Sequence, residues 1–282
     1  MNLNTIYPHH QTINLGIAAH QPSKDELILP FAWDDAFMHA LNKDELGVQA
    51  VLHFWPTAPT VFLGAMDMQA PFIADGLTWL IHSKQLMPIL RPAGGLAVVS
   101  DPGIINFTLI LKSDDKRLMI DDAYAFMVDR MNAIFKSYGE VATTGEVETS
   151  YCPGKFDVSM RGKKIAGIAQ RRIGKSIGIY VYLSLSGNQM ARGELIRQFY
   201  QETIKDQPTT VDYPAVDPQS MANLSDFIPE LADKTLFCQR LIKSISEGEQ
   251  TITKDVVLTT EQLKRPIQQM IKRNQRIQKA IS

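Results

Sequence analysis

Apolar residues recur at intervals of three and four between positions 121 and 138, at Tyr124, Met127, Val128, Met131, Ile134 and Phe135. That spacing places the apolar side chains on one face of a helix. Asp121 and Asp122 stand at the start, where the helix dipole favours negative charge, and Gly139 is a typical stop. The segment is therefore predicted to be an amphipathic helix that packs on a core.

Further helices are predicted where apolar residues repeat with the same period between proline, glycine or capping residues. They cover residues 30–46, 71–83, 191–204, 219–226 and 233–246. A last helix should begin at the capping box Thr259-x-x-Gln262 and run toward Ala280, with a kink at Pro266. Residues 1–29 are polar and mixed in character, which predicts an irregular N-terminal arm.

Short runs of apolar and β-branched residues between glycine- and proline-containing turns predict strands. They cover residues 50–55, 60–63, 87–90, 96–99, 104–111, 156–160, 164–172 and 176–185. The last three follow one another through short turns, so at least part of the sheet should be antiparallel. We expect an α+β fold, with a mixed, largely antiparallel sheet flanked by helices. Residues 1–205 should form one domain, and residues 206–282 a helical extension packed on it.

Composition narrows the class of protein without choosing a function. Of the 282 residues, 45% are apolar and 21% are charged, and the net charge is −1. These values are typical of a soluble globular protein and predict no attraction to nucleic acid or to a membrane surface. No apolar run approaches the length of a membrane span, and the N-terminal residues carry no secretory signal. We therefore expect a cytoplasmic protein. The oligomeric state is not readable from the sequence, and a monomer is the default expectation.

Cys152 is the strongest candidate for chemistry. It stands in the segment Tyr-Cys-Pro-Gly-Lys-Phe-Asp-Val-Ser, and Lys164 lies on the strand that returns from the turn. The only other cysteine is Cys238, too few for a disulfide framework, so Cys152 should be a free thiol. A thiolate is a strong nucleophile, and a nearby ammonium stabilises it and can move a proton, which suggests acyl transfer through a thioester. A small buried side chain beside an ordinary turn explains the same cysteine.

The histidines favour a lysine as the partner of Cys152. All six lie in the first third of the chain, and none is near Cys152 in sequence. A Cys-His dyad stays open, since such dyads are assembled in space, but no papain-like or caspase-like signature surrounds the cysteine. The adjacent His9 and His10 diverge on any regular element, and no further ligand type clusters beside them. No metal site is predicted.

A second informative segment runs from Arg91 to Asn106 and reads Arg-Pro-Ala-Gly-Gly-Leu-Ala-Val-Val-Ser-Asp-Pro-Gly-Ile-Ile-Asn. The paired glycines Gly94 and Gly95 permit positive φ and expose amide N–H groups that can hold a carbonyl or an oxyanion. A plain hairpin turn explains them equally. Arg91 is either an anchor for a phosphate or carboxylate, or a solvated surface charge.

Together, the two segments resemble the biotin/lipoate protein ligase and lipoyl (octanoyl) transferase superfamily. Its tunnel-lining segment, Arg-x-x-Gly-Gly-x-x-Val-x-x-Asp-x-Gly-x-x-Asn, matches Arg91, Gly94, Gly95, Val98, Asp101, Gly103 and Asn106. Its lysine segment, Gly-x-Lys-Ile-x-Gly-x-Ala-Gln-x-Arg, matches Gly162, Lys164, Ile165, Gly167, Ala169, Gln170 and Arg172. The resemblance covers approximately residues 30–205 and implies the ligase-like catalytic domain of that superfamily.

Within the superfamily, octanoyltransferases have a cysteine before the lysine segment and ATP-dependent lipoate ligases do not, so Cys152 favours a transferase. The Tyr-Cys-Pro-Gly-x-x-Asp-(Leu/Val)-Ser pattern most resembles the amidotransferase branch. That branch moves octanoyl from the H protein of the glycine-cleavage system to the lipoyl domains of dihydrolipoyl acyltransferase subunits. Ser100 stands where many members have histidine, which is consistent with this branch but removes a potential polar contact.

The resemblance implies that Cys152 attacks the octanoyl-lysine amide and that Lys164 moves the proton. Because one amide is exchanged for another, it implies no ATP, other cofactor or metal. The residues it assigns to substrate binding are Arg91, Gly94, Gly95, Leu96, Val98, Asp101, Asn106, Ala166 and Gly167. Candidate walls of an acyl tunnel are Trp55, Leu63, Leu96, Val98 and Ile165.

Three alternatives remain open from the sequence. They are an octanoyl-acyl-carrier-protein-dependent transferase, an ATP-dependent lipoate ligase, and a non-catalytic module that binds lipoyl domains. The last predicted helix carries an excess of basic residues, which could steer an acidic partner, although a solvated helix face explains them as well. These residues are Lys264, Arg265, Lys272, Arg273, Arg276 and Lys279, against the single acid Glu261.

Overall fold

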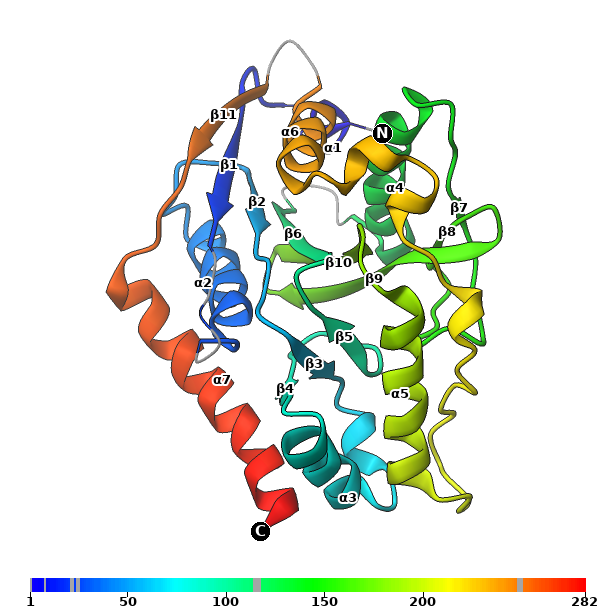
Figure 1. The fold of residues 1–282 in the computed structure, drawn as a ribbon. Helices are drawn as coiled ribbons and strands as arrows, with labels where there is room; N and C mark the ends of the chain where they lie inside the picture. The colour runs from blue at the N-terminus through cyan, green and yellow to red at the C-terminus, as the bar shows by residue number, and fades with distance from the viewer. Residues whose placement is uncertain (1, 8, 21–22, 24–25, 114–117, 248–250) are drawn as a thin grey trace.

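The computed structural model describes residues 2–7, 9–20, 23, 26–113, 118–247 and 251–282. Its largest element is an eight-stranded sheet (Figure 1). In spatial order the strands are β11 (Thr251–Asp255), β1 (Ile13–Ala19), β2 (Ala50–Phe54), β6 (Ile104–Lys112), β10 (Ser176–Ser184), β9 (Lys163–Ile173), β8 (Val158–Met160) and β7 (Thr143–Thr144). A three-stranded sheet has the order β4 (Met87–Leu90), β3 (Thr60–Leu63) and β5 (Val98–Ser100).

Strand pairing in the large sheet is mixed. β1 runs parallel to both β11 and β2, whereas every other neighbouring pair in this sheet is antiparallel. The hairpin of β9 and β10 pairs eight residues of each strand, and β10 pairs β6 over its whole length. The expected mixed, largely antiparallel sheet is therefore confirmed.

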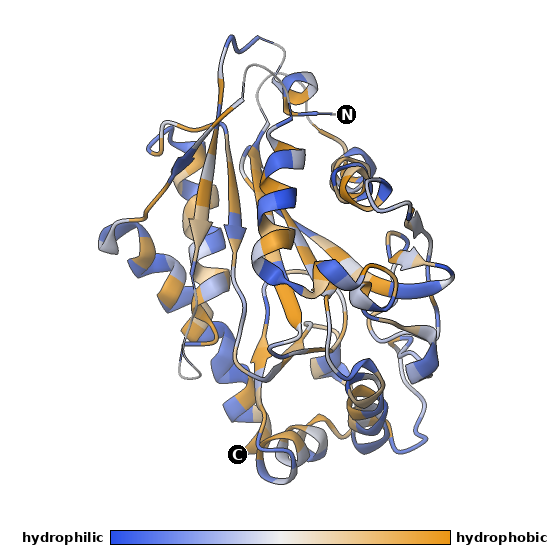
Figure 2. Ribbon diagram, turned by 45° about the horizontal axis from the view of Figure 1, so that its top comes forward, coloured by the Kyte–Doolittle hydropathy of each residue, from blue (hydrophilic) through white to orange (hydrophobic). Residues whose placement is uncertain are grey.

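Helices pack on both sheets. They are α1 (Leu3–Ile6), α2 (Leu29–Asn42), α3 (Ile73–Thr78, continued as a π-turn over Trp79–Ser83), α4 (Ile120–Lys136), α5 (Gln189–Ile204), α6 (Lys234–Ile245) and α7 (Thr260–Ile281). The apolar stripe of α4 packs with α6 and the large sheet around Phe107, Met131 and Phe237. A second core, around Phe31, Trp55 and Phe199, joins α2 and α5 to the small sheet. Figure 2 shows the apolar strands enclosed by helices of mixed polarity.

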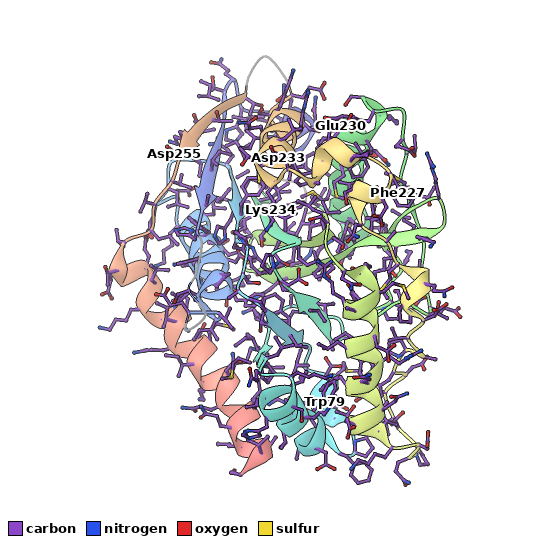
Figure 3. The ribbon with its side chains drawn as sticks, in the orientation of Figure 1. Trp79, Phe227, Glu230, Asp233, Lys234 and Asp255 are labelled. Carbon is purple, nitrogen blue, oxygen red and sulfur yellow. The ribbon has the colours of Figure 1, made fainter. Side chains whose placement is uncertain are left out.

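The helix boundaries follow local capping chemistry. The side chain of Asp233 accepts hydrogen bonds from the first turn of α6, and this aspartate lies at the start of the helix (Figure 3). The capping box of Thr259 and Gln262 begins α7 as predicted, and the helix continues through Pro266. No helix in the described residues is both long enough and apolar enough to cross a membrane.

Besides the two-residue strand β7, two strands were not expected. Residues 1–29 are not an irregular arm, because Ile13–Ala19 forms the internal strand β1. The extension is not wholly helical, because Thr251–Asp255 forms the edge strand β11 beside β1. Both strands are held by parallel pairing with distant segments, which leaves little local signal. The predicted helix over 219–226 is also wrong, since short 3₁₀ turns occupy Pro218–Ser220 and Leu224–Asp226.

The C-terminal helix α7 lies along α2 and closes the free edge of the small sheet (Figure 1). The side chain of Asn274 accepts a hydrogen bond from the N–H of Leu90 at 2.8 Å and donates to its carbonyl at 3.4 Å. An amide side chain thus pairs with the backbone of β4 directly before Arg91. The division of the chain at residue 205 and the monomeric state stay predictions.

Candidate active site

A cavity of about 450 Å³ lies among β9, β10, the glycine turn after β4 and the segment that carries Cys152. This volume is within the range of about 300–1,000 Å³ that is usual for small-molecule sites. Much of the wall is aromatic or aliphatic. The lining residues are Phe31, Trp55, Phe62, Arg91, Ala93, Gly94, Gly95, Val98, Asn106, Ile120, Asp121, Tyr124, Tyr151, Cys152, Pro153, Gly154, Lys155, Phe156, Asp157, Lys164, Gly167, Ile168, Ala169, Gln170, Tyr180, Val181 and Tyr182.

The glycine turn approaches Cys152 so closely that one of its residues must be glycine. Gly95 has a φ of +95°, in the region that L residues rarely adopt. A Cβ atom on Gly95 would lie 2.6 Å from Nη2 of Arg91 and 2.7 Å from Sγ of Cys152. A Cβ on Gly94 would meet no atom within 4 Å. The two glycines therefore differ: Gly95 serves close packing, whereas Gly94 borders open space.

Arg91 is neither a solvated charge nor a free anchor. Its side chain is buried, and Nη2 donates to the carbonyl oxygens of Gly94 at 3.0 Å and Leu96 at 2.7 Å. Nη2 also lies 3.6 Å from Sγ of Cys152. The guanidinium therefore fixes the glycine turn from inside and places positive charge beside the sulfur.

Cys152 adopts an unusual backbone conformation, with a φ of +49°. Its sulfur accepts a hydrogen bond from the N–H of Leu96 at 3.1 Å. This amide follows Gly95, so the glycine turn presents an N–H to the sulfur. An N–H donor together with the nearby guanidinium stabilises negative charge on sulfur, which is the form that acts as a nucleophile.

Lys164 is buried on β9, and its Nζ lies within hydrogen-bond distance of four oxygen atoms. Its Nζ lies 2.7 Å from the carbonyl oxygen of Cys152, 3.0 Å from that of Tyr151, 3.1 Å from Oγ of Ser150 and 2.8 Å from Oδ1 of Asp157. An ammonium carries three protons, so these four acceptors saturate it. Three hydrogen bonds and an ion pair thus hold Nζ in one position beside the residue that precedes Pro153.

Asp157 ties the lysine to the loop that carries the cysteine. Its Oδ2 accepts hydrogen bonds from the N–H groups of Val147 at 3.2 Å and Gly154 at 3.1 Å, while Oδ1 faces Lys164. Burial raises the pKa of this carboxyl, and the charge of Lys164 opposes the rise. Asp157 was part of the cysteine motif in the sequence, but no role was expected for it there.

The structure brings most of the expected residues to one cavity. Cys152 and Lys164 line it, and so do Arg91, Gly94, Gly95, Val98, Asn106 and Gly167. Leu96 contributes its N–H to the sulfur without lining the cavity, and Ala166 borders only a smaller hollow behind Lys164. Of the expected tunnel walls, Trp55 and Val98 line the cavity, whereas Leu63, Leu96 and Ile165 are buried outside its lining.

Asp101 lies apart from the cavity lining. Its carboxylate pairs with the buried guanidinium of Arg192 at 2.7 Å and accepts a hydrogen bond from the N–H of Gly103. The neighbouring Ser100, which replaces the histidine of many relatives, makes two polar contacts of its own. Its Oγ accepts a hydrogen bond from Nδ2 of Asn106 at 2.9 Å and lies 2.7 Å from Oγ1 of Thr57. Ser100 thus holds the amide of Asn106 in place at the cavity.

Several lining residues were missed from the sequence. Phe31 comes from α2, far from either motif, and Tyr180 and Tyr182 come from β10, the strand that follows the lysine motif. Tyr151 stands directly before Cys152 and could have been found as part of the motif. The sequence around the aromatic lining residues gave no sign of a site, because a buried aromatic residue in a strand or helix is usually part of the hydrophobic core.

The family of lipoyl protein ligase A/B catalytic domains matches residues 28–246 of this chain. An octanoyl-GcvH:protein N-octanoyltransferase of Macrococcus caseolyticus is 36% identical over 228 residues, which cover 78% of this chain and 81% of that protein. A protein with the same name from Oceanobacillus iheyensis is 32% identical over 276 residues, which cover 95% of this chain and 96% of that protein.

Solved structures agree on the fold. A crystal structure of lipoate-protein ligase A bound with ATP superposes with a TM-score of 0.68 at 17% identity, covering 93% of this chain and 95% of the other. A lipoate protein ligase from T. acidophilum gives 0.65, also at 17% identity, over 92% of this chain and 95% of the other. The chain therefore belongs to the lipoyl protein ligase A/B catalytic domain family, together with the octanoyltransferases that it resembles in sequence.

Proposed function

We propose that this chain transfers an octanoyl group from a lysine of one protein to a lysine of another through a thioester on Cys152. The observation that carries the proposal is the sulfur of Cys152, which accepts the N–H of Leu96 beside a cavity suited to a short acyl chain. The relatives are named for GcvH as donor, which supports the glycine-cleavage H protein in that role here. The acceptors would be lipoyl domains, as the sequence pattern implied.

In the first half of the reaction, the thiolate of Cys152 attacks the octanoyl-lysine amide. A carbon–sulfur bond forms, the carbon–nitrogen bond breaks, and the ammonium of Lys164 gives a proton to the departing amine. In the second half, an incoming lysine amine attacks the thioester, Lys164 takes its proton, and the thiolate is restored. The number of protons on the enzyme is then unchanged after each cycle.

The octanoyl tail would occupy the aromatic and aliphatic part of the cavity. Each buried methylene contributes about 0.8 kcal/mol, so a matched slot gives several kcal/mol of selectivity for the acyl chain. Amide is exchanged for amide, so the reaction is close to thermoneutral and requires no ATP or other cofactor.

Intact mass spectrometry tests this proposal. The protein is incubated with octanoylated H protein, with octanoyl-acyl-carrier protein, or with octanoate and ATP. We expect the octanoylated H protein to leave an octanoyl adduct on the wild-type protein and none on Cys152→Ser. Addition of an apo lipoyl domain should then remove the adduct. An adduct that forms only with octanoyl-acyl-carrier protein would identify the carrier protein as the donor. ATP-dependent octanoylation of the lipoyl domain that survives in Cys152→Ser would indicate a ligase.

Cys238→Ala is the matched control for that experiment. Burial raises the pKa of the Cys238 thiol to about 12, so this sulfur stays protonated and unreactive. Its replacement should leave the adduct unchanged. No adduct from any donor in the wild-type protein would contradict the thioester mechanism.

A further inference from the structure

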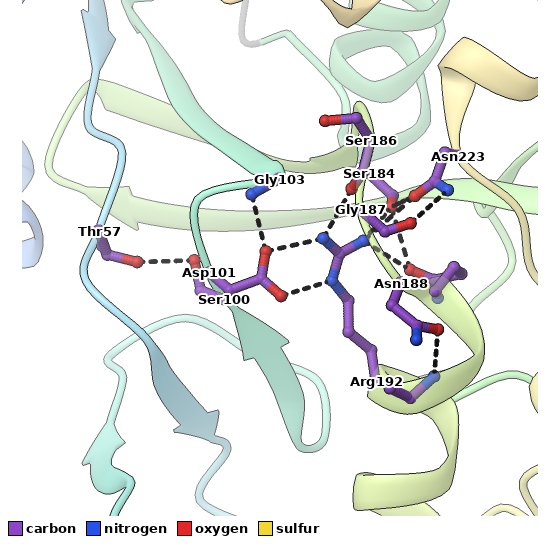
Figure 4. Close-up of polar contacts among 12 residues, drawn as sticks. Thr57, Ser100, Asp101, Gly103, Ser184, Ser186, Gly187, Asn188, Arg192 and Asn223 are labelled. Carbon is purple, nitrogen blue, oxygen red and sulfur yellow. Dashed lines mark hydrogen bonds and ion pairs between the residues drawn. The ribbon is translucent and has the colours of Figure 1, made fainter.

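A series of hydrogen-bonded polar side chains runs from Arg192, which is paired with Asp101, to the cavity. Which atom donates and which accepts in each of these hydrogen bonds follows from the chemistry of the side chains. The series begins at Arg192, whose Nη2 and Nε donate to the two carboxylate oxygens of Asp101 at 2.7 and 2.8 Å (Figure 4). Nη1 of Arg192 lies 3.1 Å from Oε1 of Gln189. A guanidinium can only donate, so Gln189 must present its oxygen to Arg192.

The amide nitrogen of Gln189 is thereby directed at Tyr151. Nε2 donates to the hydroxyl of Tyr151 at 2.8 Å, so this hydroxyl is an acceptor. The same hydroxyl lies 2.7 Å from that of Tyr182. One of the two phenols donates to the other, and the hydrogen bond that Tyr151 accepts from Gln189 decides which one donates.

Donation from Tyr182 to Tyr151 would leave the more deeply buried of the two phenols, Tyr151, with a proton that has no acceptor among the described residues. Tyr151 is 2% exposed, and Gln189 and Tyr182 are the hydrogen-bond partners of its hydroxyl within the described part of the chain. A buried donor without an acceptor is costly. Tyr151 therefore donates to Tyr182, and the proton of Tyr182 remains available. Both phenols line the cavity, but Tyr151 is 2% exposed whereas Tyr182 is only partly buried, so the proton of Tyr182 is the one that can serve a ligand there.

Tyr182 lies at the end of the cavity where the chemistry would occur. In the sheet register it stands opposite Gly167 on β9 and Asn106 on β6. A Cβ on Gly167 would lie 3.8 Å from Cε of Lys164, so the lysine side chain passes beside the same position. Burial also raises the pKa of Tyr182 well above its ordinary value, which keeps the phenol protonated as a donor.

We propose that the hydroxyl of Tyr182 donates a hydrogen bond to the carbonyl oxygen of the acyl group on Cys152. The identity of that acyl group rests on the proposed function. A hydrocarbon tail has no acceptor, so the acyl carbonyl is the acceptor that the substrate offers at this end. The bond strengthens as the carbonyl becomes an oxyanion, which makes Tyr182 a catalytic residue. Arg192, Gln189 and Tyr151 are positioning residues that direct its proton.

The test loads the intact protein with p-nitrophenyl octanoate labelled with carbon-13 at its carbonyl. The thiolate of Cys152 attacks the ester, p-nitrophenolate leaves, and the labelled thioester is observed by infrared spectroscopy. In Tyr182→Phe the carbonyl band should move to higher wavenumber, because the bond that weakens C=O is lost. The acylation rate should fall by about 100-fold, the usual effect of removing one oxyanion donor.

Gln189→Glu provides a second variant of nearly the same shape. Both carboxylate oxygens of the new side chain accept, so Tyr151 donates to it and Tyr182 must turn its proton to Tyr151. This variant should reproduce the band shift and rate loss of Tyr182→Phe, and the double variant should add little. Tyr213→Phe is the control, since the hydroxyl of Tyr213 donates to the carbonyl of Met66 outside the cavity lining.

A thioester whose band and formation rate are unchanged in both variants would overturn the assignment of Tyr182 alone. A wild-type protein that forms no thioester with the ester would overturn the thioester function and this assignment with it. Because the ester needs no donor protein, an error in the identity of the donor leaves this experiment unaffected.

Discussion

The ammonium of Lys164 lies 2.7 Å from the main-chain carbonyl oxygen of Cys152. Cys152 has a φ of +49°, a left-handed conformation that costs a non-glycine residue about 1–3 kcal/mol unless its surroundings hold it. The lysine therefore stabilises the strained residue that it would also assist in catalysis. Replacing Lys164 would disturb both the backbone of Cys152 and the proton transfer, so variants of neighbouring residues separate the structural role from the catalytic role better.

Asp157→Asn should slow acyl transfer by at least about tenfold, because an ion pair at 2.8 Å is lost in a buried site. An asparagine cannot accept both from Lys164 and from the amides of Val147 and Gly154 without turning an NH₂ toward a donor. Burial raises the pKa of Asp157, so the wild-type rate should fall on the acid side as this carboxyl takes up a proton. The variant should lack that decline.

The measurement for Asp157 is the thioester formation rate between pH 4 and pH 8. Asp75→Asn is the control, since Asp75 forms a half-exposed surface pair with Lys205, and surface pairs contribute little. Equal pH profiles for the wild type and Asp157→Asn would contradict the prediction.

Gly95→Ala should abolish acylation of Cys152 while the chain still folds. The added methyl would come within 2.7 Å of the sulfur and 2.6 Å of Arg91 at a φ of +95°. The turn must move, and the N–H of Leu96 moves with it. Gly94→Ala should lose far less activity, because its methyl meets no atom within 4 Å. Single-turnover mass spectrometry with circular dichroism as the folding check distinguishes the two variants, and equal losses in both would count against the packing argument.

Trp55→Leu should extend the range of acyl chains. Trp55 packs edge-on against Phe31 and Phe62, with ring centroids 5.0 and 5.9 Å apart, and its indole N–H donates to Thr108. Removing the indole enlarges the cavity at a cost of up to about 3–5 kcal/mol in stability. The ratio of dodecanoyl to octanoyl ester reactivity should rise. Trp79→Leu, outside the cavity lining, should keep the wild-type ratio, and an unchanged ratio in Trp55→Leu would remove Trp55 from the acyl site.

Asp67 should make stability depend on pH. Burial raises its pKa from 3.8 to about 6, against opposing contacts from the N–H of Gly64, Arg91 and Tyr200. The folded protein therefore binds more protons than the unfolded chain between pH 4 and pH 6, so the free energy of unfolding falls as pH rises through this window. The fall is of order 3 kcal/mol.

Urea unfolding of the wild type and Asp67→Asn at several pH values checks this prediction. The difference in unfolding free energy between the two proteins should change between pH 4 and pH 6 and be constant above pH 7. A difference that is constant across the whole range would show that Asp67 has an ordinary pKa in the folded protein.

The sequence determined the local structure of the molecule. Apolar spacing predicted α4, and the capping box of Thr259 and Gln262 predicted the start of α7, because these features act within one or two helical turns. The two motif segments also indicated which residues gather near Cys152, since the turn that carries the cysteine and the strand that carries Lys164 are close in sequence. Gly95 was identified as part of the glycine motif, but its close approach to Cys152 and Arg91, which requires a glycine, was not foreseen.

Only the tertiary structure decided the long-range pairings. The strands β1 and β11 depend on parallel partners, Asp101 is paired with Arg192, and the cavity walls come from elements as distant as α2 and β10. The proton of Tyr182 is directed by Gln189 and Arg192, which lie in a different element. Such contacts arise from sheet register and helix packing between segments far apart in the chain, and no local pattern of residues encodes them.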